Sequence, residues 1–204
     1  MSGAPTMRLP TSAQTIGPFF PQTFFRGGDN DLTRATTAAA PTARGERILL
    51  RGTVTREGGV PCVNAIVEAW QADAAGRFRH PADPEAALAD ADFLGWGRAW
   101  TDAAGAYEFR TVLPGGFAEP AGRRAPHIDL TVMASGLMRQ LATTLFFAEF
   151  EAANATDPVL ALVPPERRAR LVALPDGEAE GLRVFRFDLR LRGTAEEETP
   201  FFVE

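Results

Sequence analysis

Residues 124–134 read RAPHIDLTVMA, and their side chains alternate in character from residue 128 onward. Apolar residues occupy the even positions, and a mixed set that includes Asp129 occupies the odd ones. A period of two predicts a β-strand with one face in a core. His127 and Asp129 are two residues apart, so their side chains project from the same face, as paired ligands of one ion must. The stretch therefore predicts a strand that carries a two-residue candidate site.

Two other stretches belong to the same pattern. GRFRH at 76–80 follows an apolar run, in a loop of the kind that can present further ligands to the face of His127 and Asp129. Its central residue is Phe78, and GGF at 115–117 ends in Phe117. A phenyl ring has no donor atom. These positions therefore look like those of a metal site in which most of the ligand residues have been replaced.

Runs of strand-forming residues separated by turn signals begin at residue 46. We expect strands at 48–54, 65–71, 107–112, 128–134, 143–147 and 182–191, and the last run alternates most regularly. Short helices are expected at 84–88, where Asp83 can cap and Pro84 can open the first turn, and at 164–171. The pattern predicts a mainly β protein, with a β-sandwich domain over residues 46–204 that carries short helices.

Residues 1–45 have little periodicity and contain several prolines, which predicts an extended N-terminal arm that ends in loop. The segment 15–25, TIGPFFPQTFF, contains four phenylalanines without an amphipathic pattern. Apolar rings on an arm have to be buried against another surface. That surface is either this chain's own sandwich or a partner chain, and the sequence leaves both open.

Composition bounds the class of protein. The chain has 204 residues and a net charge of −5, so we expect one domain with extensions and no nucleic-acid partner. Cys62 is the single cysteine, which excludes an intrachain disulfide and makes a reducing cytoplasm the expected compartment. No run approaches the roughly 20 apolar residues of a membrane span, and no signal peptide is apparent. We expect a soluble, unprocessed, cytoplasmic protein with no membrane partner.

Five motifs together resemble the intradiol ring-cleavage dioxygenases, in that family's order and spacing. The likeness runs from about Thr11 to the C-terminus and is closest to the α chains of members built from an α and a β chain. The resemblance implies a shared β-sandwich fold, αβ pairing into larger oligomers, and Fe(III) bound by two tyrosines and two histidines of the β chain. The motifs are TIGP (15–18), GVPCVNAIVEAWQAD (59–73), GRFRH (76–80), GAYEFRTVLPG (105–115) and RAPHID (124–129).

The resemblance carries the four ligand positions onto this chain one at a time. The first tyrosine falls on Phe78 and the second on Phe117, while the first histidine is kept as His127 and the second is replaced by Asp129. Ferric ion is a hard acid that depends here on phenolate oxygens. Tyr107 is the only tyrosine, and it lies in a strand at a position that the family uses for packing. The resemblance therefore implies that this chain binds no metal.

Other interpretations of these residues remain open. His80, His127 and Asp129, with a glutamate, are the kind of set that forms a facial triad for ferrous iron. The plainer alternative makes His80 a surface loop residue and His127 a buried imidazole that bonds to Asp129 or a backbone carbonyl. Arg124 is expected in a salt bridge or an interface. We expect Trp70 in the core and Gln71 in a buried hydrogen bond.

The resemblance also implies a role for the arm. In the family the α chain's arm supplies part of the pocket wall above the β chain's iron, which places Thr15, Gly17 and Pro18 near a bound aromatic acid. The implied reaction is cleavage of a dihydroxylated aromatic acid by O2 between its hydroxyl groups. Two alternatives are a free-standing β-sandwich that serves in binding or structure, and a single-chain enzyme, which Phe78 and Phe117 disfavour.

Overall fold

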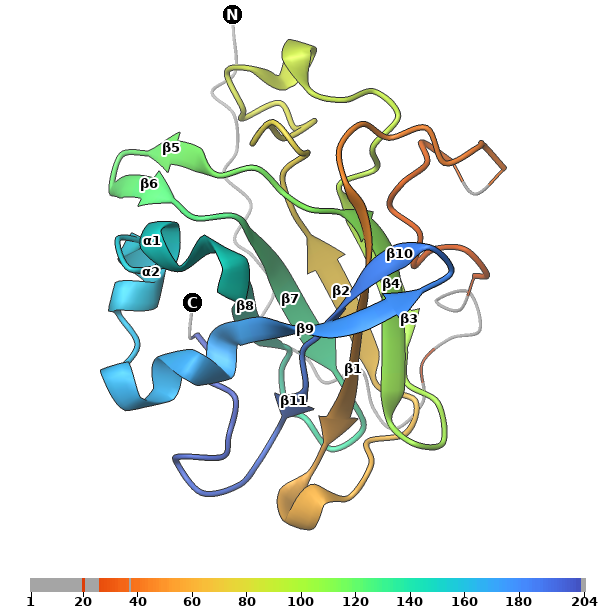
Figure 1. Cartoon of the computed structure of the whole chain (residues 1–204). Coiled ribbons are helices and arrows are strands. Elements are labelled where there is room, and N and C mark those ends of the chain that lie inside the picture. The colour runs from red at the N-terminus through yellow and green to blue at the C-terminus, as the bar shows by residue number, and fades with distance from the viewer. Residues whose placement is uncertain (1–19, 21–25, 37, 203–204) are drawn as a thin grey trace, which may run out of the picture.

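The computed structural model describes residues 20, 26–36 and 38–202, and strands dominate it (Figure 1). The prediction of a mainly β protein with short helices is therefore confirmed. The helical segments are α1 (Glu151–Asn154) and α2 (Pro158–Ala161), with 3-10 turns at Glu57–Gly59, Ala86–Leu88, Ala148–Phe150 and Pro165–Leu171. The strands are β1 (Arg47–Thr55), β2 (Ile66–Trp70), β3 (Trp96–Trp100), β4 (Ala106–Val112), β5 (Phe117–Glu119), β6 (Gly122–Arg124), β7 (His127–Met133), β8 (Leu141–Phe147), β9 (Val172–Ala179), β10 (Leu182–Arg186) and β11 (Leu189–Arg190).

The strands form two layers that share one connecting strand. One layer has the order β4-β1-β10-β9, and the other has the order β3-β2-β7-β8. β9 joins them because it pairs antiparallel with β10 along most of its length and parallel with β8 at Val172 and Ala173. A separate hairpin, β5–β6, precedes β7 and lies beside α2 (Figure 1).

The core lies between these two layers and is rich in phenylalanine. Phe147 of β8 meets Phe185 of β10 edge to face, with ring centroids 5.0 Å apart, so the two layers contact through aromatic rings. Each fully buried phenylalanine or large aliphatic residue contributes about 1.5–3 kcal/mol relative to an exposed one. The largest fully buried side chains are Phe109, Phe146, Phe147, Phe185, Leu32, Ile48, Leu49, Leu50, Ile66, Ile128, Leu130 and Leu145.

The described part of residues 20–45 packs onto the sandwich through Leu32. This side chain is fully buried, its N–H donates to Arg110 O at 2.8 Å, and its carbonyl accepts from Leu94 N at 3.0 Å. The side chain also fills the space that Gly97 leaves by having no Cβ. The segment from which we expected a pocket wall, with Thr15, Gly17 and Pro18, lies outside the described residues.

The prediction of one regular strand over 182–191 is wrong. The chain forms β10 and β11, which both pair parallel with β1 in the same register. Between them the carboxylate of Asp188 accepts from Thr53 N at 2.8 Å, where a regular ladder would use a backbone carbonyl. Asp188 occupies an ordinary polar position in the alternation, so the pattern does not reveal the break.

The expected helix at 84–88 is also shorter than predicted. Only Ala86–Leu88 is helical, and Glu85, not Asp83, is the residue that precedes its first turn. The Asp83 carboxylate accepts from Phe78 N at 2.6 Å and from Glu85 N at 2.7 Å. The expected strands near 48–54, 65–71, 107–112, 128–134 and 143–147 and the helical turn at 165–171 are confirmed within a few residues.

None of the helices in the described residues is long and apolar enough to pass through a bilayer.

Candidate functional site

A cavity of about 810 Å³ brings together all four positions that we singled out as degenerate metal positions. It is bounded by the loop that follows β2, by the β5–β6 hairpin and by the first residues of β7. Phe78, Phe117, His127 and Asp129 all line it. The other lining residues are Trp70, Gly76, His80, Ala82, Asp83, Pro84, Glu85, Ala118, Glu119, Pro120 and Arg124.

Aromatic rings form one continuous wall of this cavity. Phe78 stacks on Trp70 with centroids 5.7 Å apart and meets Phe117 edge to face at 5.0 Å. Phe117 in turn lies 5.4 Å from the ring of His127. The expectation of Trp70 in the core is wrong, because its side chain is 37% exposed. Trp70 shares a strand face with the half-buried Glu68, which is the sequence signal that we missed.

A crossing of two backbone segments fixes the relative position of the two phenylalanines. Gly76 lies two residues before Phe78, and Gly115 lies two residues before Phe117. A Cβ added to Gly76 would approach Gly116 O to 2.5 Å, and one added to Gly115 would approach Gly76 N to 2.5 Å. Gly76 also has a φ of +79°, which glycine adopts without steric cost. The close crossing therefore depends on the absence of side chains.

His127 is buried, with 3% of its surface exposed, and among the described residues only its Nδ1 has a hydrogen-bond partner. Its Nδ1 lies 2.6 Å from Ala125 O, and because a carbonyl oxygen can only accept, Nδ1 carries the proton. Burial lowers the pKa of His127, and this outweighs the opposite effect of Asp129 on that pKa. The ring is therefore neutral near pH 7, and its Nε2 presents a lone pair. The expected hydrogen bond to a backbone carbonyl is confirmed.

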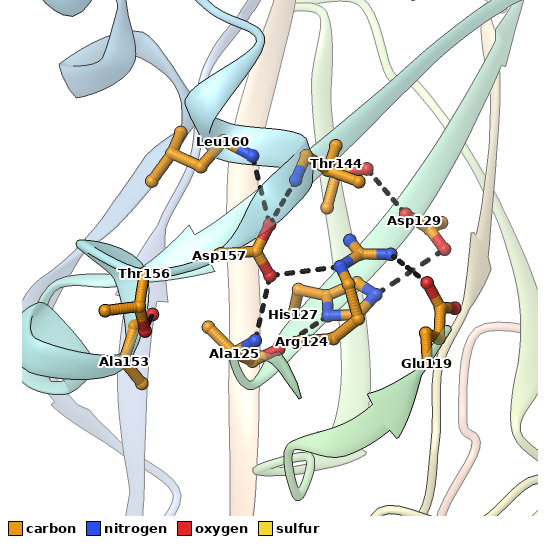
Figure 2. Close-up of polar contacts among 11 residues, drawn as sticks. Glu119, Arg124, Ala125, His127, Asp129, Thr144, Ala153, Thr156, Asp157 and Leu160 are labelled. Atoms are coloured by element: carbon orange, nitrogen blue, oxygen red, sulfur yellow. Dashed lines mark hydrogen bonds and ion pairs between the residues drawn. The ribbon is translucent and has the colours of Figure 1, made fainter. Parts of the chain in front are cut away.

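Asp129 faces the same lone pair across the cavity edge (Figure 2). Its Oδ2 lies 3.8 Å from His127 Nε2, which is too long for a hydrogen bond. Its Oδ1 accepts from Thr144 Oγ1 at 2.6 Å, because Thr144 is directly opposite Asp129 in the β7–β8 ladder. The Asp129 side chain is 45% exposed. Two acceptor atoms therefore face each other with no donor from the described residues between them.

Arg124 belongs to a separate, buried ion pair (Figure 2). Its Nε donates to Asp157 Oδ2 at 3.0 Å, and Ala125 N donates to the same oxygen at 2.8 Å. The other oxygen of Asp157 caps α2 by accepting from Val159 N and Leu160 N. The expected salt bridge of Arg124 is confirmed. This ion pair holds the end of β6 and the start of β7 against α2.

The Asp157 carboxylate is stabilised in its charged form. Burial alone would raise the pKa of Asp157, but donors from the backbone at Leu160 and Ala125 and from Arg124 outweigh burial and lower it. The partner Asp157 was not singled out from the sequence, although the pair Asp157-Pro158 is the same cap signal that we used at Asp83-Pro84. Glu119 and Thr144, which contact Arg124 and Asp129, were also missed.

The donor atoms at the four positions do not fit a ferric ion. Phe78 and Phe117 have no oxygen, so His127 Nε2 and one carboxylate are the only donors of the four. His80 is exposed, as expected for a loop residue, and its Nδ1 accepts from Ala82 N at 3.2 Å. Within the described residues no three His, Cys, Asp or Glu side chains come close enough to hold a metal, so these residues do not form the facial triad.

Tyr107 does not compensate for the missing phenolates. It lies on β4, is buried, and its hydroxyl donates to Phe187 O at 2.6 Å. Burial raises the pKa of this phenol well above its usual value, so it stays protonated. Its packing role is therefore confirmed. Gln71 also has the expected buried bonds, to Val112 O and from Thr111 Oγ1.

Comparison with known proteins identifies the class to which this fold and site belong. A dioxygenase family model matches residues 16–193. Among solved structures, catechol 1,2-dioxygenase from Acinetobacter sp. ADP1 aligns with a TM-score of 0.60 and 26% identity over 80% of this chain and 58% of that one. A dioxygenase domain from Streptomyces sp. SirexAA-E aligns with a TM-score of 0.57 and 27% identity, over 89% and 97% of the two chains. The chain belongs to the intradiol dioxygenase family.

Curated relatives narrow the position within that family. The protocatechuate 3,4-dioxygenase alpha chain of Burkholderia cepacia is 41% identical over 199 residues, which cover 94% of this chain and 96% of that relative. The alpha chain of Pseudomonas putida is 37% identical over 94% and 95% of the two chains. The beta chain of Burkholderia cepacia is 38% identical over 81% and 72%. The chain is thus similar to both kinds of subunit, and its likeness to the alpha chains extends over nearly their whole length.

Proposed function

We propose that this chain is the α subunit of a protocatechuate 3,4-dioxygenase and completes the active site of a homologous catalytic β subunit. The observation that carries the proposal is the cavity in which Phe78 and Phe117 replace two oxygen donors while the fold around them is retained. The nearly full-length likeness to alpha chains supports it. The assembled enzyme, in the cytoplasm, uses O2 to open the ring of protocatechuate between its hydroxyl groups and gives 3-carboxy-cis,cis-muconate.

In this proposal all metal chemistry belongs to the β subunit, which holds Fe(III), and this chain binds none. Its contribution is to shape the substrate pocket of the β subunit. In this proposal the part of the arm that contains residues 15–18 reaches the partner, and Thr15, Gly17 and Pro18 line the pocket above the iron. Glycine and proline in sequence support this role, because proline fixes the bend and glycine has no side chain, so that a flat aromatic acid can approach the backbone closely.

Co-expression with a β chain tests the proposal directly. We expect a stable hetero-oligomer that contains one iron per pair of chains and cleaves protocatechuate, whereas the isolated chain is colourless and inactive. Stoichiometric iron with visible tyrosinate absorption in the isolated chain would contradict the proposal. Failure to form any heteromer would favour the free-standing β-sandwich protein that the sequence leaves open.

The arm is tested within the assembled enzyme. Replacing Gly17 by valine adds a side chain where the substrate ring approaches, so we expect a raised KM for protocatechuate with the iron content unchanged. Ser12→Val, in the same arm but outside the TIGP motif, is the matched control and should leave KM unaltered. Equal effects of the two substitutions would show that residues 15–18 do not line the pocket.

A further inference from the structure

The two acceptor atoms at the cavity edge define what can sit between them. His127 Nε2 carries a lone pair, because the proton of the neutral ring is on Nδ1 and is used by Ala125 O. Asp129 Oδ2 is a second acceptor, 3.8 Å away. A single nitrogen that carries two or more hydrogens can donate to both, at ordinary distances of about 2.8–3.0 Å from each. A metal ion would need further ligands, which the described residues do not supply.

The charge of the cavity favours a cation. Its carboxylates are those of Asp83, Glu85, Glu119 and Asp129, against the single guanidinium of Arg124. Asp83 is satisfied by backbone N–H groups, and Glu85 is bound by Arg77 at 3.1 Å. Asp129 has only the neutral Thr144 hydroxyl as a donor among the described residues. Among the described residues, Asp129 therefore has one neutral donor and no guanidinium partner.

The positive charge of Arg124 is already offset by two carboxylates. Its Nε is used by Asp157, and its Nη1 lies 3.8 Å from Glu119. Its remaining nitrogen, Nη2, has no hydrogen-bond partner among the described residues, but it is shielded from solvent. A carboxylate ligand in the cavity would instead meet the acceptors of His127 and Asp129, which repel it.

The aromatic wall suits the same class of ligand. Phe78, Phe117 and Trp70 line the cavity next to His127 and Asp129. Ring faces attract an ammonium or guanidinium group within about 6 Å of their centroid, and they also stack on a flat apolar body. Acceptors, charge and rings therefore point to one ligand chemistry.

We propose that this cavity is a binding site for an organic cation with N–H donors, an ammonium or guanidinium group held between His127 Nε2 and Asp129 Oδ2 against the rings of Phe78 and Phe117. The cation is either a free amine or the basic side chain of a partner chain. The proposal concerns residues of this chain alone, so it goes beyond the proposed subunit role and does not require that role to be correct.

Titration calorimetry on the isolated full-length chain at pH 7.5 tests it, with three probes of nearly equal size. Benzylammonium should bind with a Kd of about 0.1–1 mM, benzyl alcohol about tenfold more weakly, and benzoate not measurably. Quenching of tryptophan fluorescence should report the same order, because Trp70 stacks on Phe78 in the cavity wall. Absence of benzylammonium binding, or benzoate binding of equal strength, would overturn the proposal.

Two matched substitutions locate the probe. Asp129→Asn keeps the size of the side chain and an oxygen for the Thr144 hydroxyl, but removes the charge, and should weaken benzylammonium at least about tenfold. Glu85→Gln removes one charge from the same cavity, where the carboxylate is already paired with Arg77, and should change the affinity by less than about twofold. Equal losses from both would mean that the probe senses only the general field of the cavity, which would refute the specific site.

The assembled enzyme distinguishes the two sources of the cation. If benzylammonium binds the free chain but not the complex with the β chain, a basic side chain of the partner fills the site. If it binds both, the ligand is a free amine. Because the probe is first measured on the isolated chain, failure of the site and failure of the subunit proposal give separate results.

Discussion

Two acid–base pairs lie next to each other around the start of β7, and they differ in how completely their polar atoms are used. Asp157 accepts four N–H groups, from Arg124, Ala125, Val159 and Leu160, and is buried. Asp129, by contrast, accepts one hydroxyl and faces the lone pair of His127. We call the first the closed pair and the second the open pair. The closed pair stabilises the fold, whereas the open pair leaves bonding capacity for a ligand.

The largest expected effect comes from breaking the closed pair. Asp157→Ala leaves a buried guanidinium without its partner and removes the cap of α2, so we expect a loss of about 3–5 kcal/mol in the free energy of unfolding. Urea denaturation measures it, and Asp157→Asn serves if the alanine variant does not fold. Glu85→Ala, which breaks the exposed pair with Arg77, is the control and should cost less than about 1 kcal/mol. Equal costs would remove the distinction between buried and exposed pairs.

Acidification should weaken the protein through both pairs in the same direction. The pKa of Asp157 is lowered in the fold, so the unfolded chain takes up the proton first, and the stabilisation is complete above about pH 5 and lost as the pH falls through the folded pKa. The pKa of His127 is also lowered, so its share begins to be lost below about pH 6.5.

The measurement for this pH effect is the urea midpoint between pH 8 and pH 3. We expect a decline that begins below about pH 6.5 and continues below about pH 5 as Asp157 adds its share. In Asp157→Asn the part of the decline below about pH 5 should be reduced, because the titrating carboxyl is gone. A midpoint that stays constant down to pH 3 would contradict the assignment of both groups.

A smaller effect is expected at Tyr107, whose buried hydrogen bond to Phe187 O involves no charged group. Tyr107→Phe leaves the buried Phe187 carbonyl without its donor, and we expect a loss of about 1–2 kcal/mol. Thermal or urea unfolding measures it, with Phe109→Leu on the same strand as a packing reference. A loss as large as that of Asp157→Ala would show that burial of the hydrogen bond, and not its charge, determines the loss of stability.

The smallest effect on stability is expected at the open pair. Asp129→Asn should change the free energy of unfolding by less than about 0.5 kcal/mol, because the carboxylate is half exposed and makes one neutral hydrogen bond in the fold. Urea denaturation of this variant beside Asp157→Asn makes the comparison with a matched change of charge. A loss above about 2 kcal/mol at Asp129 would make the open pair structural and would remove the reason to assign it a ligand.

The sequence predicts those strands and site residues whose placement follows from patterns within short stretches of the chain. The period of two places His127 and Asp129 on one face, and the family motifs bring Phe78 and Phe117 to the same cavity. The local pair Asp157-Pro158 signals a helix cap, but the ion pair of Asp157 could not be predicted because its partner Arg124 is 33 residues away, a separation that no local pattern encodes. The break at Asp188 could not be predicted for the same reason, since its acceptor role depends on Thr53, 135 residues away.

The crossing of Gly76 and Gly115 has a consequence for how the chemistry of the cavity can change. The relative position of the two loops is set by main-chain contact, independently of what the side chains at positions 78 and 117 can coordinate. Substitutions at these two positions can therefore change which atoms the cavity offers to a ligand while the main-chain crossing stays the same. A new binding chemistry here requires new side chains and no new backbone.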